Sequence, residues 1–201
     1  DSSNNKIKKK IIKYKNIKYF KRKVKSGRGS AVIFGMKEMI KEKKIDLIVE
    51  MDTDLSSHPK ELPKNIKFVK KEKLDLLIFS RYLKGSKIIN WPLRRRIFSF
   101  LSNKLANFLI RAKVSDYTMG YRIYSMKATV QVAKNCGKVG SGFIVLSEIL
   151  AELHYNNFKI RDTKTTFINR EKGDSTVGLK LIYESLIGVF KIYFKYRRIM
   201  P

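Results

Sequence analysis

The stretch KIDLIVEMDTDLSSHPKELP, residues 44–63, decides the fold. Its mostly apolar run at 45–51 has the length and continuity of a buried β-strand. Two carboxylates, Asp52 and Asp54, follow that strand one residue apart. Pro59 comes soon after and suits the first turn of a helix. The stretch therefore predicts a strand and a helical turn with two acids between them.

The same alternation continues on both sides of this stretch. We expect further strands at 17–24, 74–82 and 158–168, and helices at 6–16, 27–43, 92–111, 126–134, 143–156 and 178–198. The 92–111 helix is amphipathic, which predicts a buried apolar face made of Leu93, Ile97, Leu101, Leu105, Phe108 and Leu109. Alternating strands and helices predict one α/β domain over residues 1–201 with a mostly parallel central sheet. Ligands of such sheets bind beyond the carboxyl ends of the strands.

The chain is strongly basic, with a net charge of +28. Such a surplus favours anionic partners such as nucleic acid, anionic lipid or phosphorylated small molecules. A compositional excess of solvated surface lysine is the alternative. The single cysteine, Cys136, excludes an internal disulfide and a metal site with several thiolate ligands. No signal peptide is visible, and no apolar run reaches the roughly 18 residues of a membrane span.

The acidic pair after the first strand of this stretch suggests a cation site. Two carboxylates held near one point repel each other unless a cation lies between them. Their hard oxygen atoms suit Mg²⁺ or Mn²⁺, and Mg²⁺ typically adds substrate phosphates to one or two protein carboxylates. A metal-bridged diphosphate is therefore one interpretation of Asp52 and Asp54. The other is that both residues form turns or cap the helix that begins at Pro59.

Basic residues gather after the next predicted strand. Arg81 ends that strand, and Arg95 lies one helical turn before Ser99. Arginine binds phosphate oxygens as a fork, and a serine hydroxyl on the same helix face adds a donor. A solvated arginine run is the alternative, above all for Arg94 and Arg96. A further polar loop, INREKGDS, contains Arg170, Lys172 and Ser175.

Six segments in order give the chain a resemblance to a known family. They are GRGSAVIFGMK (27–37), MDTDLSSHPKELP (51–63), SRYLKGS (80–86), WPLRRRIFS (91–99), SDYTMGYRIY (115–124) and INREKGDS (168–175). The chain resembles glycosyltransferase family 2, and within it the dolichyl-phosphate mannose synthases and their polyprenyl-phosphate relatives. The resemblance implies a GT-A, Rossmann-like catalytic domain. It also implies that the first strand and helix of the family are absent here, because DSSNN at 1–5 looks like the tail of the motif that ends that strand.

The resemblance assigns roles to individual residues. It implies that the metal, Mg²⁺ or Mn²⁺, is held by Asp52, Asp54 and Ser56. The residues expected to bind the nucleotide-sugar donor are Asp1, Gly29, Asp52 and Arg170. Those expected to bind the lipid phosphate are Arg81, Arg95 and Ser99, with Asp54 and Arg81 taken as catalytic. Asp116 and Arg122 match a family motif and are interpreted as architecture.

The function implied is an inverting, metal-dependent transfer of a hexose, mannose from GDP-mannose, to a polyprenyl or dolichyl phosphate. A lipid phosphate is already anionic, so it can attack without a strong general base, and catalysis rests on positioning and on the metal. The 178–198 helix could lie on a membrane surface, which predicts peripheral attachment at the cytoplasmic face. A core-packing helix is the alternative.

Three other functions stay open at this point. Transfer of glucose or another sugar uses the same scaffold. A nucleic-acid-binding module would explain the charge, but the basic residues form no recognisable binding motif, so no nucleic-acid partner is expected. A truncated, inactive family member that binds lipid or a partner is the third.

Overall fold

The computed structural model describes residues 10–11, 13–24, 26–42, 44–140, 142–169 and 179–197. Its centre is a four-stranded sheet in the order β1-β4-β2-β5, made of β1 (Leu47–Glu50), β4 (Arg122–Ser125), β2 (Leu76–Ser80) and β5 (Ile160–Lys164). Strands β1, β2 and β5 point the same way, as expected, whereas β4 runs antiparallel to both of its neighbours. The α/β class is confirmed, with a mixed sheet.

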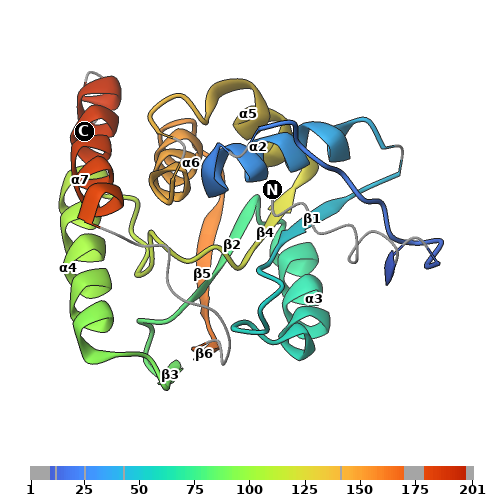
Figure 1. Cartoon of the computed structure of the whole chain (residues 1–201), viewed down its shortest axis with the longest axis horizontal. Helices are drawn as coiled ribbons and strands as arrows, with labels where there is room; N and C mark the ends of the chain where they lie inside the picture. The colour runs from blue at the N-terminus through green and yellow to red at the C-terminus, as the bar shows by residue number, and fades with distance from the viewer. Residues whose placement is uncertain are drawn as a thin grey trace.

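Helices cover both sides of this sheet (Figure 1). Helices α2 (Gly27–Ile40), α5 (Met126–Asn135) and α6 (Ile144–Tyr155) lie together on one side, and α3 (Leu62–Glu72) lies on the other. Helices α4 (Leu93–Ile110) and α7 (Leu179–Tyr196) pack against each other beyond β5. A short helix, η1 (Pro59–Glu61), precedes α3, and β3 (Lys87–Ile89) pairs in parallel with β6 (Thr166–Ile168).

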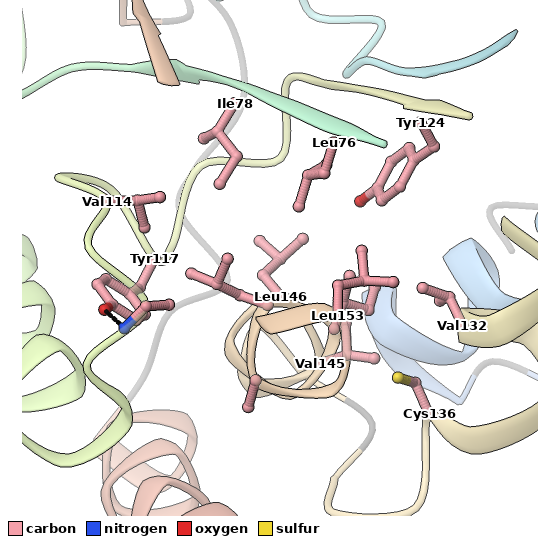
Figure 2. Close-up of a cluster of buried hydrophobic side chains, with 14 of the residues drawn as sticks. Leu76, Ile78, Val114, Tyr117, Tyr124, Val132, Cys136, Val145, Leu146 and Leu153 are labelled. Carbon is pink, nitrogen blue, oxygen red and sulfur yellow. Dashed lines mark hydrogen bonds between the residues drawn. The ribbon is translucent and has the colours of Figure 1, made fainter. Parts of the chain in front are cut away.

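The core forms between the sheet and α6. Strand β2 is buried at every position, as its continuous apolar sequence predicts for a strand covered on both faces. Helix α6 is buried from Ile144 to Leu153. Figure 2 shows Leu146 of α6 facing the side of the sheet that carries Leu76 and Ile78. The apolar runs of β2 and α6 thus pack directly on each other.

Three local predictions are wrong. Residues 17–24 form no strand and are mostly exposed. Strand β1 is half-buried and not fully buried. Of the expected helix at 6–16, the structure describes residues 10–11, which are helical, and 13–16, which are not.

Helix α4 turns part of its predicted core face outward. Leu93, Ile97 and Phe108 are between half and 70% exposed. Leu109 is buried and Leu105 packs against the core, as predicted, and the buried face also carries Ser99 and Asn103. Asn103 accepts a hydrogen bond from the N–H of Tyr117 and donates to Thr118, so polar partners in the core satisfy this face. The apolar stripe of α4 is therefore free to meet something other than the core.

Arg122 at the start of β4 ties the sheet to α6. Its side chain is fully buried. The guanidinium donates to three backbone carbonyls, those of Met119 (2.8 Å), Leu146 (2.9 Å) and Tyr117 (3.1 Å). This agrees with its interpretation as architecture.

We expect Arg122→Met to lower the free energy of unfolding by about 3 kcal/mol or more, because three buried carbonyls lose their donor. Urea denaturation followed by circular dichroism measures the loss. Lys64→Met, an exposed change on α3, is the control and should leave the midpoint almost unchanged. Equal midpoints for both variants would show that Arg122 does not hold the sheet to α6.

Candidate functional site

The predicted acidic pair lies where β1 ends. Asp52 and Asp54 are both exposed, whereas Ser56 is buried. Asp54 Oδ1 accepts a hydrogen bond from the Ser56 N–H (3.0 Å), so this residue also shapes the turn, as the alternative interpretation held. Within the described part of the chain, no group of three His, Cys, Asp or Glu side chains is arranged to hold a metal. Two exposed carboxylates fit a hard divalent cation that takes its remaining oxygens from a diphosphate and water.

An arginine that the sequence analysis did not assign contacts this pair. Arg28, the second residue of α2, places Nη2 3.2 Å from Asp52 Oδ1 and Nη1 2.9 Å from Glu50 Oε1. Burial alone would lower the pKa of Arg28, but the two carboxylates raise it above its ordinary value. Tyr124 donates its hydroxyl to Glu50 (2.8 Å), which fixes that carboxylate from the sheet side. The one signal in the sequence that could have pointed to Arg28 was its position between two glycines, Gly27 and Gly29, where a helix was expected to begin.

Residue 29, next to Arg28, is a glycine because α2 packs closely on α6 at this point. A Cβ added there would come within 2.8 Å of the Gly142 carbonyl oxygen and of Val145 Cβ. The close approach of α2 to α6 therefore requires glycine. Its predicted part in donor binding stays a prediction, as do those of Asp1 and Arg170, which lie outside the described residues together with Lys172 and Ser175.

The second predicted cluster lies at the carboxyl end of β2. Arg81 is buried, and its fork meets Asp116 through Nε (2.8 Å) and Nη2 (2.9 Å). Nη2 also donates to Thr118 (2.7 Å). Burial would raise the pKa of Asp116, but the charge and hydrogen bonds of Arg81 hold it below its ordinary value. The aromatic rings of Trp91 and Phe167 lie 5.0 and 5.6 Å from the guanidinium carbon.

A pocket of about 410 Å³ opens beside Arg81. Both polar and apolar side chains line it. Those that are basic or carry a hydroxyl are Arg81, Tyr82, Ser86 and Arg96, and the apolar ones are Leu83, Ile88, Leu93, Ile97 and Phe100. Ser99 accepts a hydrogen bond from the Tyr82 hydroxyl (2.8 Å). Arg95 lies over the ring of Trp91 (5.8 Å). Sequence reasoning thus missed Tyr82 and Arg96, both of which line the pocket.

The loop before β4 connects the two clusters. Asp116 and Thr118 bind Arg81, while Gly120 of the same loop lies against Arg28. Strand β6 makes a second connection, because Ile168 donates its N–H to the Ser56 carbonyl (3.0 Å) while the neighbouring Phe167 stacks near Arg81. The structure therefore brings the carboxylates and the basic pocket to one edge of the sheet.

Comparison with known proteins agrees with this arrangement. The model of a family described as glycosyl transferase family 2 matches residues 1–132. An undecaprenyl-phosphate mannosyltransferase of Micrococcus luteus is 30% identical over 169 residues, which is 84% of this chain and 68% of that protein. A dolichol-phosphate mannosyltransferase of Pyrococcus furiosus is 32% identical over 179 residues, which is 88% of this chain and 47% of that protein. The chain thus spans about two thirds of one relative and about half of the other.

We expect Asp116→Asn to destabilise the protein by about 3–5 kcal/mol at neutral pH, because Arg81 would stay buried without its counter-charge. Since the pKa of Asp116 is lowered on folding, its contribution is present above the ordinary carboxyl pKa of about 3.9 and is lost as pH falls through the lower folded value. Urea denaturation between neutral and acidic pH measures both effects.

The matched control for this prediction is Asp46→Asn. Asp46 pairs with Lys70 at 3.4 Å, and both side chains are more than half exposed. Surface pairs contribute at most about 1 kcal/mol. If the two asparagine variants lost the same stability, the buried pair would not be a structural anchor.

Proposed function

Because the chain belongs to glycosyl transferase family 2, we propose that it transfers a hexose, mannose from GDP-mannose, to a polyprenyl phosphate. Membership makes the chain a glycosyltransferase and carries with it the GT-A fold, in agreement with the α/β architecture. The observation that carries the proposal is one sheet edge with two exposed carboxylates and a pocket that is both basic and apolar. The two relatives, named as acting on undecaprenyl and dolichol phosphate, support this acceptor class.

On the donor side, Asp52 and Asp54 would hold Mg²⁺ or Mn²⁺, with Ser56 as a third predicted ligand. The cation would supply charge stabilisation for the departing nucleoside diphosphate. The Asx turn that Asp54 makes with the Ser56 N–H keeps the loop after β1 in a defined shape. Asp1, Gly29 and Arg170 complete the proposed donor site.

On the acceptor side, the phosphate would lie near Arg81 and Arg96, with Arg95 and Ser99 close by. The Nε and Nη2 of Arg81 already donate to Asp116 and Thr118. Arg81 would therefore attract the phosphate mainly through its fixed positive charge and not through a bidentate hydrogen bond. The first isoprene unit would meet the apolar lining of the pocket. An acceptor already charged and held in place needs positioning above all, and its attack from the far side of the leaving group would invert the sugar centre.

The exposed apolar stripe of α4 supports attachment to a membrane surface. Leu93, Ile97 and Phe100 both line the pocket and belong to this stripe, which continues through Leu101 and Phe108. Helix α7 packs on α4 and adds further exposed apolar side chains, those of Tyr183, Leu186, Ile187, Phe190 and Phe194. Lysines and arginines accompany both helices, as anionic lipid would require.

Across the described ranges, no helix combines the length and apolar character needed to span a bilayer. The exposed apolar side chains of α4 and α7 are the reason why we propose peripheral attachment by these two helices, at the cytoplasmic face.

The proposed activity is tested by transfer from GDP-mannose and from UDP-glucose to a polyprenyl phosphate, with Mn²⁺ or Mg²⁺ and then with chelator. We expect transfer that prefers GDP-mannose, stops with chelator and falls at least about 100-fold in Asp52→Asn and Asp54→Asn. Preference for UDP-glucose would show that the transferred sugar is glucose and not mannose. Salt-dependent binding to duplex DNA without any sugar transfer would favour the nucleic-acid-binding alternative.

Membrane attachment is tested by flotation with phosphatidylglycerol vesicles. The double change Leu101→Glu and Phe108→Glu lies outside the pocket and should reduce the vesicle-bound fraction several-fold, because charges on the contact face would have to enter the bilayer interface. Phe68→Glu on α3, the helix on the other side of the sheet, is the control. Retention of binding by the double variant would rule out α4 as the contact.

A further inference from the structure

We propose that Arg28 is a built-in counter-cation for Asp52, so that the carboxylate pair binds a divalent cation weakly until a nucleoside diphosphate arrives. This inference rests on the metal site of the proposed function and adds an order of binding to it. Arg28 would be a positioning residue that exchanges its carboxylate partners for the diphosphate.

The first support is the charge arrangement around the pair. Asp52 and Glu50 both lie within 3.2 Å of the Arg28 guanidinium, which neutralises part of their charge. A divalent cation on Asp52 would therefore lie next to a fixed positive charge, and like charges at that separation repel. A bound diphosphate removes this repulsion, because its negative oxygens attract the cation and the arginine alike.

The second support is that the Arg28 guanidinium fills a space that only a glycine at position 120 leaves open. A Cβ at Gly120 would lie 2.0 Å from Arg28 Nη2 and 2.7 Å from its Cζ. The ring of Phe143 lies on another side, with its centroid 5.7 Å from Cζ. The guanidinium therefore occupies a slot between the loop before β4 and the start of α6, and only a residue without a side chain at 120 leaves this slot open.

The third support is that the contact between Arg28 and Asp52 is long. The 3.2 Å separation between Nη2 and Asp52 Oδ1 exceeds the 2.7–2.9 Å that is usual for a charge-assisted hydrogen bond. The contact with Glu50 is closer, at 2.9 Å between Nη1 and Oε1, but these two buried atoms form no aligned hydrogen bond within the described part of the chain. Phosphate oxygens would offer the fork better geometry.

The experiment titrates Mn²⁺ by electron paramagnetic resonance, without and with GDP, and measures GDP binding in chelator by calorimetry. In the natural protein, GDP should tighten Mn²⁺ binding about tenfold or more. Arg28→Gln should tighten Mn²⁺ binding in the absence of GDP several-fold, weaken GDP binding in chelator and reduce the effect of GDP on Mn²⁺.

Two further variants separate charge from position. Arg28→Lys keeps the charge and should keep weak binding of Mn²⁺ alone. Gly120→Ala keeps Arg28, but the added Cβ would overlap Nη2, the atom that meets Asp52, so the fork must shift. We expect the shift to break this contact and to tighten the binding of Mn²⁺ alone, as Arg28→Gln does. Arg22→Gln is the control, because Arg22 precedes α2 and donates to the Gly27 carbonyl (3.2 Å) at the start of that helix.

The outcomes distinguish this inference from the metal site itself. Unchanged or weaker binding of Mn²⁺ alone in Arg28→Gln, with GDP-dependent binding that still requires Asp52, would overturn the role of Arg28 and leave the metal site standing. Absence of Mn²⁺ binding even with GDP would overturn both. Thermal melting by circular dichroism checks that each variant is folded. If Arg28→Gln does not fold, Gly120→Ala still tests the position of the guanidinium.

Discussion

The bidentate ion pair between Arg81 and Asp116 joins the end of β2 to the loop before β4, and both groups are buried. Neither charge can lose its partner cheaply, because an unpaired buried charge costs several kcal/mol. The loop is therefore fixed in place, with Thr118 bound to Arg81 on one side and Gly120 set against Arg28 on the other. This electrostatic contact thus links the basic pocket to the carboxylates after β1, beside the second link through β6.

Much of the architecture could be predicted from sequence because apolar continuity reports burial directly. The runs that form β2 and α6 are examples, since β2 is buried at every position and α6 from Ile144 to Leu153. Strand β4 could not be found this way, since it begins with Arg122, a charged residue that is buried because its guanidinium donates to three backbone carbonyls. The face of α4 was misjudged for a different reason. Amphipathicity reveals which face is apolar, but not whether protein or another apolar phase covers it.

The residues of the candidate site likewise divide into those that could be predicted from the sequence and those that could not. The acidic pair was visible because strand ends are where α/β sheets collect ligands, and the six motifs pointed to the family. Which arginine of a run reaches the pocket depends on the phase of the helix, and adjacent residues differ by about 100°. Arg96 lines the pocket while Arg95 lies over Trp91. Arg28 escaped notice because its partners lie 22 and 24 residues away, beyond any local pattern.

The apolar stripe of α4 has a consequence for how the proposed acceptor would be found. The same side chains, such as Leu93 and Ile97, form a wall of the pocket and part of the exposed surface. With that surface on a bilayer, a polyprenyl phosphate would reach the pocket by lateral diffusion and would keep its tail in lipid throughout. Encounter would then be a two-dimensional search, governed by the number of acceptor molecules per unit area of membrane and not by their concentration in bulk solution.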